Sequence, residues 1–253
     1  MPMLTITPLT GLPMVEPGDD LAALIVAALG RHALALERGD ILVVAQKIVS
    51  KSEGRLVRLA SVTPTAQALS LAKETEKDPR LVQLILDEST EVLRKKPGVL
   101  IVRNRLGIVG AQAGIDQSNV EHGDDEKALL LPKDPDASAA RLRAALQQRT
   151  GVRPGVIVSD SMNRPWRLGS IGGAIGSAGI QVLDDRRGQR DIYGRELKVT
   201  LINRADSIAT AAILMMGETT ERTPVALVRG FAEESSDATA RDAIRPLDED
   251  MFR

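Results

Sequence analysis

The stretch that constrains this chain most runs Val156-Ile157-Val158-Ser159-Asp160-Ser161-Met162-Asn163-Arg164-Pro165-Trp166-Arg167. Its first residues are apolar and β-branched, which predicts a buried strand. We expect that strand to end among a carboxylate, two hydroxyls and two arginines around a proline that stops regular structure. Strand ends often present polar side chains to a cleft. A surface turn with a local Asp–Arg pair explains the spacing equally well.

The polar groups of this stretch suit two kinds of ligand. Asp160 and Ser161 offer hard oxygen ligands for Mg or Mn. Arg164 and Arg167 can hold phosphate or carboxylate groups. The sequence therefore predicts a polar cleft beside this strand.

Composition excludes several classes of protein. The 253 residues suffice for one large domain or two smaller ones that share a cleft, and only 2% are aromatic, so the core must be aliphatic. A net charge of −1 gives no field that would attract nucleic acid or an anionic membrane. The absence of cysteine excludes disulfides and thiolate chemistry, and two histidines are too few for a His-rich zinc site.

The N-terminus lacks a secretion signal, and no apolar run approaches the roughly 20 residues of a membrane span. We therefore expect a cytoplasmic protein. Strands and helices mix without strict alternation, so the expected fold class is α+β or irregular α/β. Expected strands cover 3–8, 41–45, 99–102, 107–109, 156–158, 197–202 and 225–228, and expected helices cover 21–36, 65–96 with a break near 78–79, 137–150 and 207–215.

Three further segments carry polar side chains. Lys51 is expected in a loop after a buried strand, where it could meet a triphosphate, although no Walker sequence is present and a solvated surface role is more common. Asp116 and Asn119 could bind a metal and a nucleotide, or form ordinary Asx turns. The segment 217–224 could wrap phosphates and supply Glu218 to a metal, or serve only as a helix cap and loop.

The glycine-rich run 169–179 does not match the dinucleotide pattern GxGxxG, which argues against a hydride-transferring enzyme. We expect it to allow close packing of a helix against a sheet or of a partner subunit. Three separate segments carry the acidic residues Asp116, Asp160 and Glu218, and the basic residues are Lys51, Arg164 and Arg167. A two-metal nucleotide site needs such a combination of acidic and basic groups.

Several longer motifs resemble a known family. They are Gly11-Leu12-Pro13, 17–21, 48–55, 114–119, 160–167, Asp191-Ile192-Tyr193-Gly194 and 223–230. In this order they resemble the coenzyme F-420-0:L-glutamate ligases, known as the CofE family, and the ligase domain of the actinobacterial protein FbiB. The resemblance covers about residues 4–232.

The resemblance implies a GTP-dependent ligase that adds L-glutamate to the deazaflavin precursor coenzyme F-420-0 and then extends the tail by γ-linked glutamates. It also implies two Mg or Mn ions, help from a monovalent cation such as K, and an intertwined homodimer whose CofE-like fold contains two sub-structures. The chain would be a single ligase unit over 1–253, without the C-terminal reductase domain of FbiB.

The resemblance also implies site residues. Asp116 and Asp160 match ligands of one metal, and Ser161 and Glu218 match ligands of the second. Lys51 would add positive charge beside the transferred phosphate, while the assignment of Arg164 and Arg167 to glutamate or the acceptor rests on charge alone. Nucleotide-contacting positions are matched by Leu12, Pro13, Met14, Val15, Gln46, Lys51, Asn119, Met216, Gly217, Glu218, Thr219, Thr220, Glu221, Arg222 and Thr223.

Two positions depart from relatives. Asn163 stands where many have Gly, and Gln46 stands where the mycobacterial form has Ser. The Asn163 departure leaves the number of glutamates added and the acceptor variant open. The alternative function is a GTP- and metal-binding regulatory or assembly protein without ligase activity.

Overall fold

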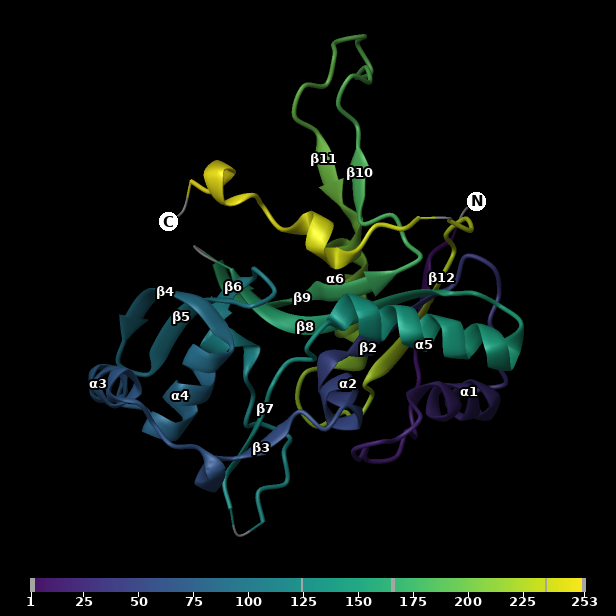
Figure 1. Cartoon of the computed structure of the whole chain (residues 1–253). Coiled ribbons are helices and arrows are strands. Elements are labelled where there is room, and N and C mark those ends of the chain that lie inside the picture. Colours follow the sequence, from purple (N-terminus) through teal and green to yellow (C-terminus); the bar gives the residue numbers. More distant parts are fainter. Residues whose placement is uncertain (1–2, 124, 165–166, 235, 252–253) are drawn as a thin grey trace.

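The computed structural model describes residues 3–123, 125–164, 167–234 and 236–251. Its centre is a five-stranded sheet in the order β1-β12-β2-β8-β9, in which β2 and β8 are parallel and the other neighbours are antiparallel (Figure 1). The strands are β1 (Thr5–Pro8), β12 (Val225–Arg229), β2 (Ile41–Ala45), β8 (Gly155–Arg164) and β9 (Arg167–Ala178). The mixed α and β composition agrees with the expected class.

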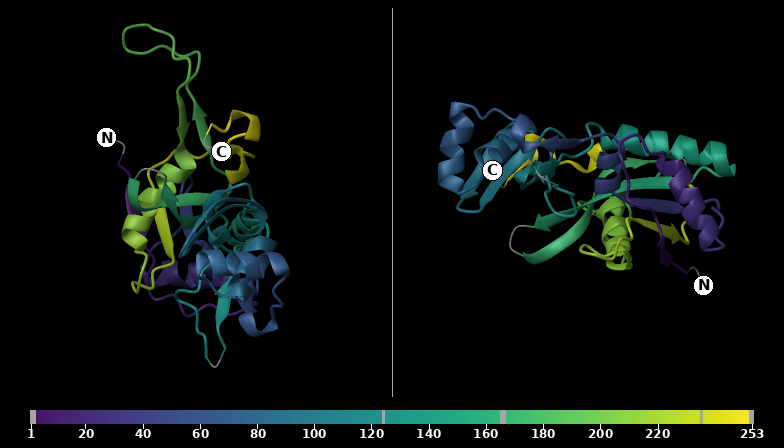
Figure 2. Two further views of the ribbon diagram at one scale, coloured as in Figure 1. Left: turned by 90° about the vertical axis from the view of Figure 1, so that its left-hand side faces the viewer. Right: turned by 90° about the horizontal axis from the view of Figure 1, so that it is seen from below.

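Strand periodicity places apolar side chains on both faces of this sheet. In β2, Leu42 and Val44 enter one hydrophobic cluster, whereas Ile41 and Val43 enter another. The first cluster also contains residues of α1 (Leu21–Arg31) and α5 (Pro135–Thr150), and the second contains residues of α6 (Arg204–Met216). The sheet is therefore a layer between α1 and α5 on one side and α6 on the other (Figure 2).

The glycines of β9 allow helices to approach the sheet closely. A β-carbon at Gly172 would lie 2.6 Å from the carbonyl oxygen of Ala209 in α6, and one at Gly176 would overlap the backbone of Pro135 at the start of α5. The expected close packing of a helix on a sheet is confirmed. The run itself forms a strand, however, because it pairs with β8 along almost its whole length.

A third hydrophobic cluster lies beside the central layers (Figure 1). It joins α3 (Ala66–Thr75) and α4 (Pro79–Asp87) to the three-stranded sheet β4 (Ser89–Lys96), β5 (Val99–Asn104) and β6 (Val109–Ala111). The short pair β3 (Leu56–Arg58) and β7 (Lys127–Leu129) connects this part to the centre.

Several expected boundaries were wrong. Residues 89–96 were expected to continue a helix, but they form β4, since pairing with β5 outweighs their modest helical propensity. The first helix ends at Arg31 instead of 36, and two residues after its end Ala33 takes a left-handed φ of 53°. The strand expected over 197–202 is only β11 (Leu201–Asn203). The strand begun at 156 does not end near 158 but continues to Arg164 in a hairpin.

Two segments extend from the central layers. Between β10 (Leu183–Asp185) and β11 the chain forms a long arm that projects from the body, called the 183–203 arm below (Figure 1). The C-terminal segment crosses the surface and includes the short 3-10 helices Ala240–Ala243 and Leu247–Glu249. Among the described residues, no helix is long and apolar enough to cross a membrane.

Candidate active site

A cavity of about 490 Å³ lies where five segments meet. Every position that the sequence assigned to a nucleotide lines it. The segments are the N-terminal loop 12–15, the start of α2 (Gln46–Ser52), the loop 119–121, β8 at 159–161, and the end of α6 with its following loop. We call this space the active-site cavity.

Helix α2 brings two lysines to the cavity. It begins directly after β2, so Lys51 lies in a helix and the expected loop position was wrong. The Lys51 Nζ donates a hydrogen bond of 3.0 Å to the Asn119 carbonyl. Burial, together with the charge of Lys47, lowers the pKa of Lys51. Sequence reasoning missed Lys47, although its spacing of four residues from Lys51 places both on one helix face.

Asp116 is held by both its backbone and its side chain. Its N–H and carbonyl pair with Leu129 at 3.0 and 2.8 Å. Its carboxylate lies 2.5 Å from the Lys47 ammonium and accepts a 2.6 Å hydrogen bond from the Ser118 N–H. Burial opposes its ionisation, but the hydrogen bonds from Lys47 and Ser118 outweigh burial and lower the pKa of Asp116. Asp116 is therefore an anion at neutral pH.

Asn119 connects two walls of the cavity. Its φ of 55° is left-handed, a conformation that Asn tolerates better than most residues. Its Nδ2 donates a 3.1 Å hydrogen bond to the carbonyl of Thr219. The 116–119 loop is thus tied to the 217–223 loop across 100 residues of sequence.

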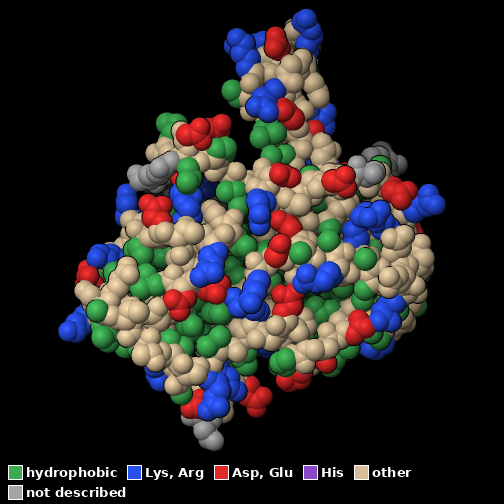
Figure 3. All heavy atoms as spheres, viewed as in Figure 1, with side chains coloured by type: hydrophobic (Ala, Val, Ile, Leu, Met, Phe, Trp, Pro, Cys, Tyr) green, Lys and Arg blue, Asp and Glu red, His purple; other side chains and the backbone are tan. Residues whose placement is uncertain are grey.

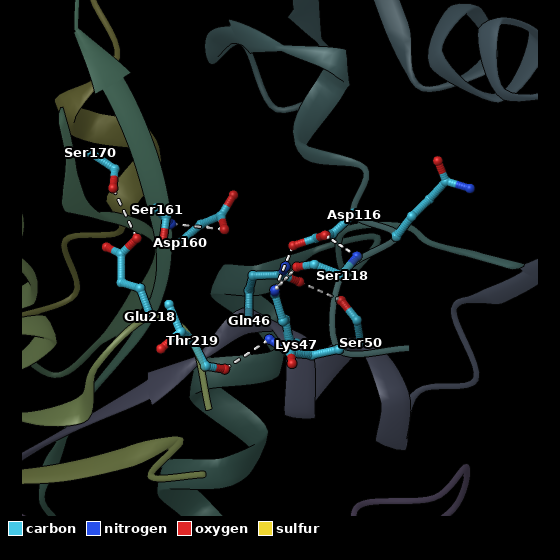
Figure 4. A network of polar contacts seen from close by, with 12 residues as sticks. Gln46, Lys47, Ser50, Asp116, Ser118, Asp160, Ser161, Ser170, Glu218 and Thr219 are labelled. Carbon is cyan, nitrogen blue, oxygen red and sulfur yellow. Dashed lines mark hydrogen bonds and ion pairs between the residues drawn. The ribbon is translucent and has the colours of Figure 1, made fainter. Parts of the chain in front are cut away.

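Asp160, Ser161 and Glu218 lie together on the opposite wall (Figure 4). Burial is the main cause that raises the pKa of Asp160 to about 7, and the carboxylates of Asp116 and Glu218 contribute to this rise. A 2.9 Å hydrogen bond from the Ser161 N–H and the charge of Lys47 act against it. Glu218 accepts a 2.9 Å hydrogen bond from the Ser170 hydroxyl. The cavity therefore contains a carboxyl group that lacks sufficient positive charge nearby.

These oxygens suit Mg²⁺ or Mn²⁺ in chemistry, because hard cations prefer carboxylate and hydroxyl ligands. Within the described ranges, no three acidic or histidine side chains are gathered closely enough to share an ion. Asp116 instead takes Lys47 as its counter-ion. The charges of Asp116 and Glu218 raise the pKa of Asp160, although Asp116, unlike Asp160 and Glu218, does not line the active-site cavity.

Gln46 is the most buried polar side chain of the cavity wall, with 2% of its surface exposed. Its Oε1 accepts a 2.9 Å hydrogen bond from the Ser50 hydroxyl. Its Nε2 has no hydrogen-bond partner among the described residues. A buried donor without a partner costs about 1–3 kcal/mol, which a ligand with an acceptor atom would offset.

Of the two arginines of the opening motif, only the side chain of Arg167 is described. Arg167 is exposed at the first residue of β9 and does not line the cavity. The side chain of Arg164, with Pro165 and Trp166, lies outside the described part of the chain. Their assignment to glutamate or the acceptor remains a prediction.

A cleft in which lysines and buried carboxyl groups converge from several loops, with perturbed pKa values, is typical of an enzyme active site. The chain belongs to the F420-0:Gamma-glutamyl ligase family, whose model matches residues 11–230. It is thus an enzyme of the ligase class.

Relatives match over nearly the whole chain. A coenzyme F420:L-glutamate ligase of Methanothermobacter thermautotrophicus is 44% identical over 96% of each chain. The protein of the same name from Methanopyrus kandleri is 44% identical over 100% of this chain and 99% of its own. That of Methanocaldococcus jannaschii is 43% identical over 86% of each.

Proposed function

We propose that this chain is a GTP-dependent ligase that joins L-glutamate to coenzyme F420-0 through an acyl phosphate and then extends the tail by γ-linked glutamates. The names of the relatives support glutamate as the added group. The single observation that carries the nucleotide assignment is the convergence of all the assigned segments on one cavity containing Lys51.

The proposed chemistry follows from the poor reactivity of a carboxylate toward an amine. The acceptor carboxylate attacks the γ-phosphorus of GTP, the bond to the bridging oxygen breaks, and GDP leaves. The glutamate amine then attacks the acyl carbon, loses a proton, and expels inorganic phosphate. Overall, one amide bond forms for each GTP cleaved.

Within this scheme the lysines and carboxyl groups have separate roles. Lys51 places positive charge at the cavity wall, which favours the phosphate oxygens as their charge changes during transfer. Asp116 and Asp160 would hold one Mg or Mn ion, and Ser161 and Glu218 the second, and the bound metal would neutralise phosphate charge. Asp160, with a pKa of about 7, is also suited to accept a proton at neutral pH when no cation is bound.

Gln46 supports a preference for GTP. Its unpartnered Nε2 is a donor, and guanine offers a carbonyl acceptor where adenine offers an amino donor. Asn119, by contrast, uses its amide nitrogen on Thr219, so only its carbonyl side could read a base. We infer that Gln46 is the better placed of the two side chains to distinguish the bases.

We further propose that the chain forms a homodimer through the 183–203 arm. Ile192, Tyr193 and Val199 on this arm are 90%, 89% and 86% exposed. Large apolar side chains on a projecting hairpin lose this exposure when they pack on another molecule. Because Figure 3 shows both basic and acidic side chains on the arm, a second copy that carries the same mixture of charges is a suitable partner.

The test is a reaction of the purified protein with GTP, Mn²⁺, L-glutamate and coenzyme F420-0, with products identified by mass spectrometry. The proposal expects a mass increase of one or more glutamate residues and GDP in equal number. GTP hydrolysis independent of glutamate and acceptor, with no mass increase, would instead indicate a GTP-binding regulatory or assembly protein.

A further inference from the structure

The loop that follows α6 forms one wall of the active-site cavity from Gly217 to Thr223. Helix α6 ends at Met216, and Gly217 turns the chain with a φ of 73°. Beyond this turn the N–H groups of the loop no longer have partners within a helix, so they need other acceptors. Successive N–H groups that point to one place in a turn form a site for an anion.

The carboxylate of Glu221 folds back onto these N–H groups. It accepts a 2.8 Å hydrogen bond from the Thr219 N–H, and the Thr219 hydroxyl donates to the same carboxylate, 3.1 and 3.2 Å from its two oxygens. Hydrogen bonds from its own N–H, and from the N–H groups of Thr219 and Thr220, lower the pKa of Glu221. An anion that belongs to the protein itself therefore occupies the turn of the loop.

The loop backbone is held by contacts that do not involve this carboxylate. The Asn119 Nδ2 donates a 3.1 Å hydrogen bond to the Thr219 carbonyl, and the Thr223 hydroxyl donates one of 3.1 Å to the Glu221 carbonyl. Gly217 leaves room for the carboxylate, since a β-carbon there would lie 2.2 Å from the Glu221 Cδ. The carboxylate can therefore leave its place while these backbone contacts remain.

Little else holds the Glu221 side chain. The residue is exposed, and in the described part of the chain no Lys or Arg side chain contributes to its lowered pKa. Its partners are backbone N–H groups and one hydroxyl, which are donors that a phosphate oxygen accepts equally well. A phosphate group that enters this part of the cavity and the Glu221 carboxylate would compete for the same donors.

We propose that Glu221 occupies a phosphate subsite of the active-site cavity and leaves it when a nucleotide phosphate binds. The inference rests on the proposed function, which supplies the nucleotide. Glu221 keeps the donors of Thr219 and Thr220 in place in the ligand-free enzyme, and its competition weakens the binding of GDP. Weaker GDP binding favours product release, which must precede each further addition of glutamate.

The test is titration calorimetry of pyrophosphate without metal, and separately of GDP with Mg²⁺, into the intact protein and three variants. Glu221→Ala should bind both ligands about tenfold more tightly, the effect of freeing donors for one hydrogen bond to a charged group. Glu221→Gln keeps a weaker acceptor and should gain only about threefold. Melting temperatures without ligand establish that each variant is folded.

Glu121→Ala is the matched control. Glu121 also lines the cavity but belongs to a different loop, where its carbonyl accepts a 2.9 Å hydrogen bond from the Lys127 ammonium. Its removal deletes one negative charge without freeing the donors of the 217–223 loop. Because exposed charges are screened by salt, this variant should change either affinity by less than about twofold.

Hydrogen exchange measured by mass spectrometry reports the displacement directly. The segment 217–223 should exchange faster in Glu221→Ala than in the unmodified protein, and pyrophosphate should restore its protection. The proposal is overturned if Glu221→Ala gains no affinity for pyrophosphate, if it gains none for GDP that the unmodified protein does bind, or if Glu121→Ala gains as much. Absence of GDP binding in all four proteins, with tighter pyrophosphate binding by Glu221→Ala, would contradict the nucleotide assignment and support the phosphate subsite.

Discussion

The ammonium of Lys47 lies 2.5 Å from the carboxylate of Asp116, and both side chains are about one-quarter exposed, at 27% and 29%. The pair joins the first turn of α2 to a loop that also carries Asn119. In the proposed enzyme, Asp116 would bind a cation. In that case Lys47 would be the positive charge that neutralises the Asp116 carboxylate until a cation binds.

We predict that Lys47→Met lowers the stability of the metal-free protein by about 1 kcal/mol at neutral pH, because a partly buried carboxylate loses its partner. Mn²⁺ should then raise the melting temperature of this variant more than that of the unmodified protein. Lys73→Met, an exposed change on α3, is the control. An equal Mn²⁺ effect in all three proteins would contradict a cation at Asp116.

Asp160 should make the stability of the metal-free protein depend on pH. Its folded pKa of about 7 lies above the ordinary 3.8, so its contribution is fully present below pH 4 and is lost as pH rises through 7. Asp160→Asn should therefore gain up to about 4 kcal/mol at pH 8 and nothing near pH 4. Urea unfolding at both pH values measures this difference.

The same Asp160→Asn variant should release no GDP in the ligase assay, because an amide is a poor ligand for a hard cation. Its stability at pH 8 shows that the loss is chemical and not a failure to fold. Full ligase activity would exclude Asp160 from the metal site.

Gln46→Leu should reduce the preference for GTP over ATP by about tenfold, since one hydrogen bond of roughly 1.4 kcal/mol would be lost. The ratio of kcat/KM for the two nucleotides measures it. Gln46→Glu keeps the acceptor for Ser50 but replaces the donor, and it should reduce the ratio as well. An unchanged ratio in both variants would show that Gln46 does not read the base.

Close packing in β9 gives a prediction for the fold. Gly176→Ala should destabilise the protein by about 2–3 kcal/mol, because the added carbon would overlap the rigid backbone of Pro135. Gly110→Ala in β6 meets nothing within 4 Å and should have little effect. Equal melting temperatures would show that α5 can move away from the sheet at no cost.

The proposed dimer depends on the 183–203 arm. Ile192→Glu should place a charge in the proposed dimer contact. The molecular mass measured by light scattering should then fall from that of two chains to that of one. Leu214→Glu, at an 82% exposed position on α6, is the control. A single-chain mass for the unmodified protein, or a stable dimer in the Ile192→Glu variant, would be the contrary outcome.

Local sequence determined much of the framework. The apolar run Ile41–Ala45 predicts β2 because β-branched residues buried on both faces have few other stable arrangements. Asp134 followed by Pro135 predicts the start of α5, since a carboxylate cap and a proline in the first turn satisfy local backbone requirements. Every position that the long motifs assigned to a nucleotide lines the active-site cavity, and contact with a nucleotide stays a prediction.

Only the tertiary structure decided which of these groups meet. Residues 89–96 form a strand because they pair with β5. The glycine run 169–179 pairs with β8, and its small residues allow α5 and α6 to pack closely on the sheet. The Lys47–Asp116 pair and the unpartnered amide of Gln46 depend on contacts between distant segments. No local pattern encodes such contacts, because their energies come from burial and charge proximity that exist only once the layers have packed.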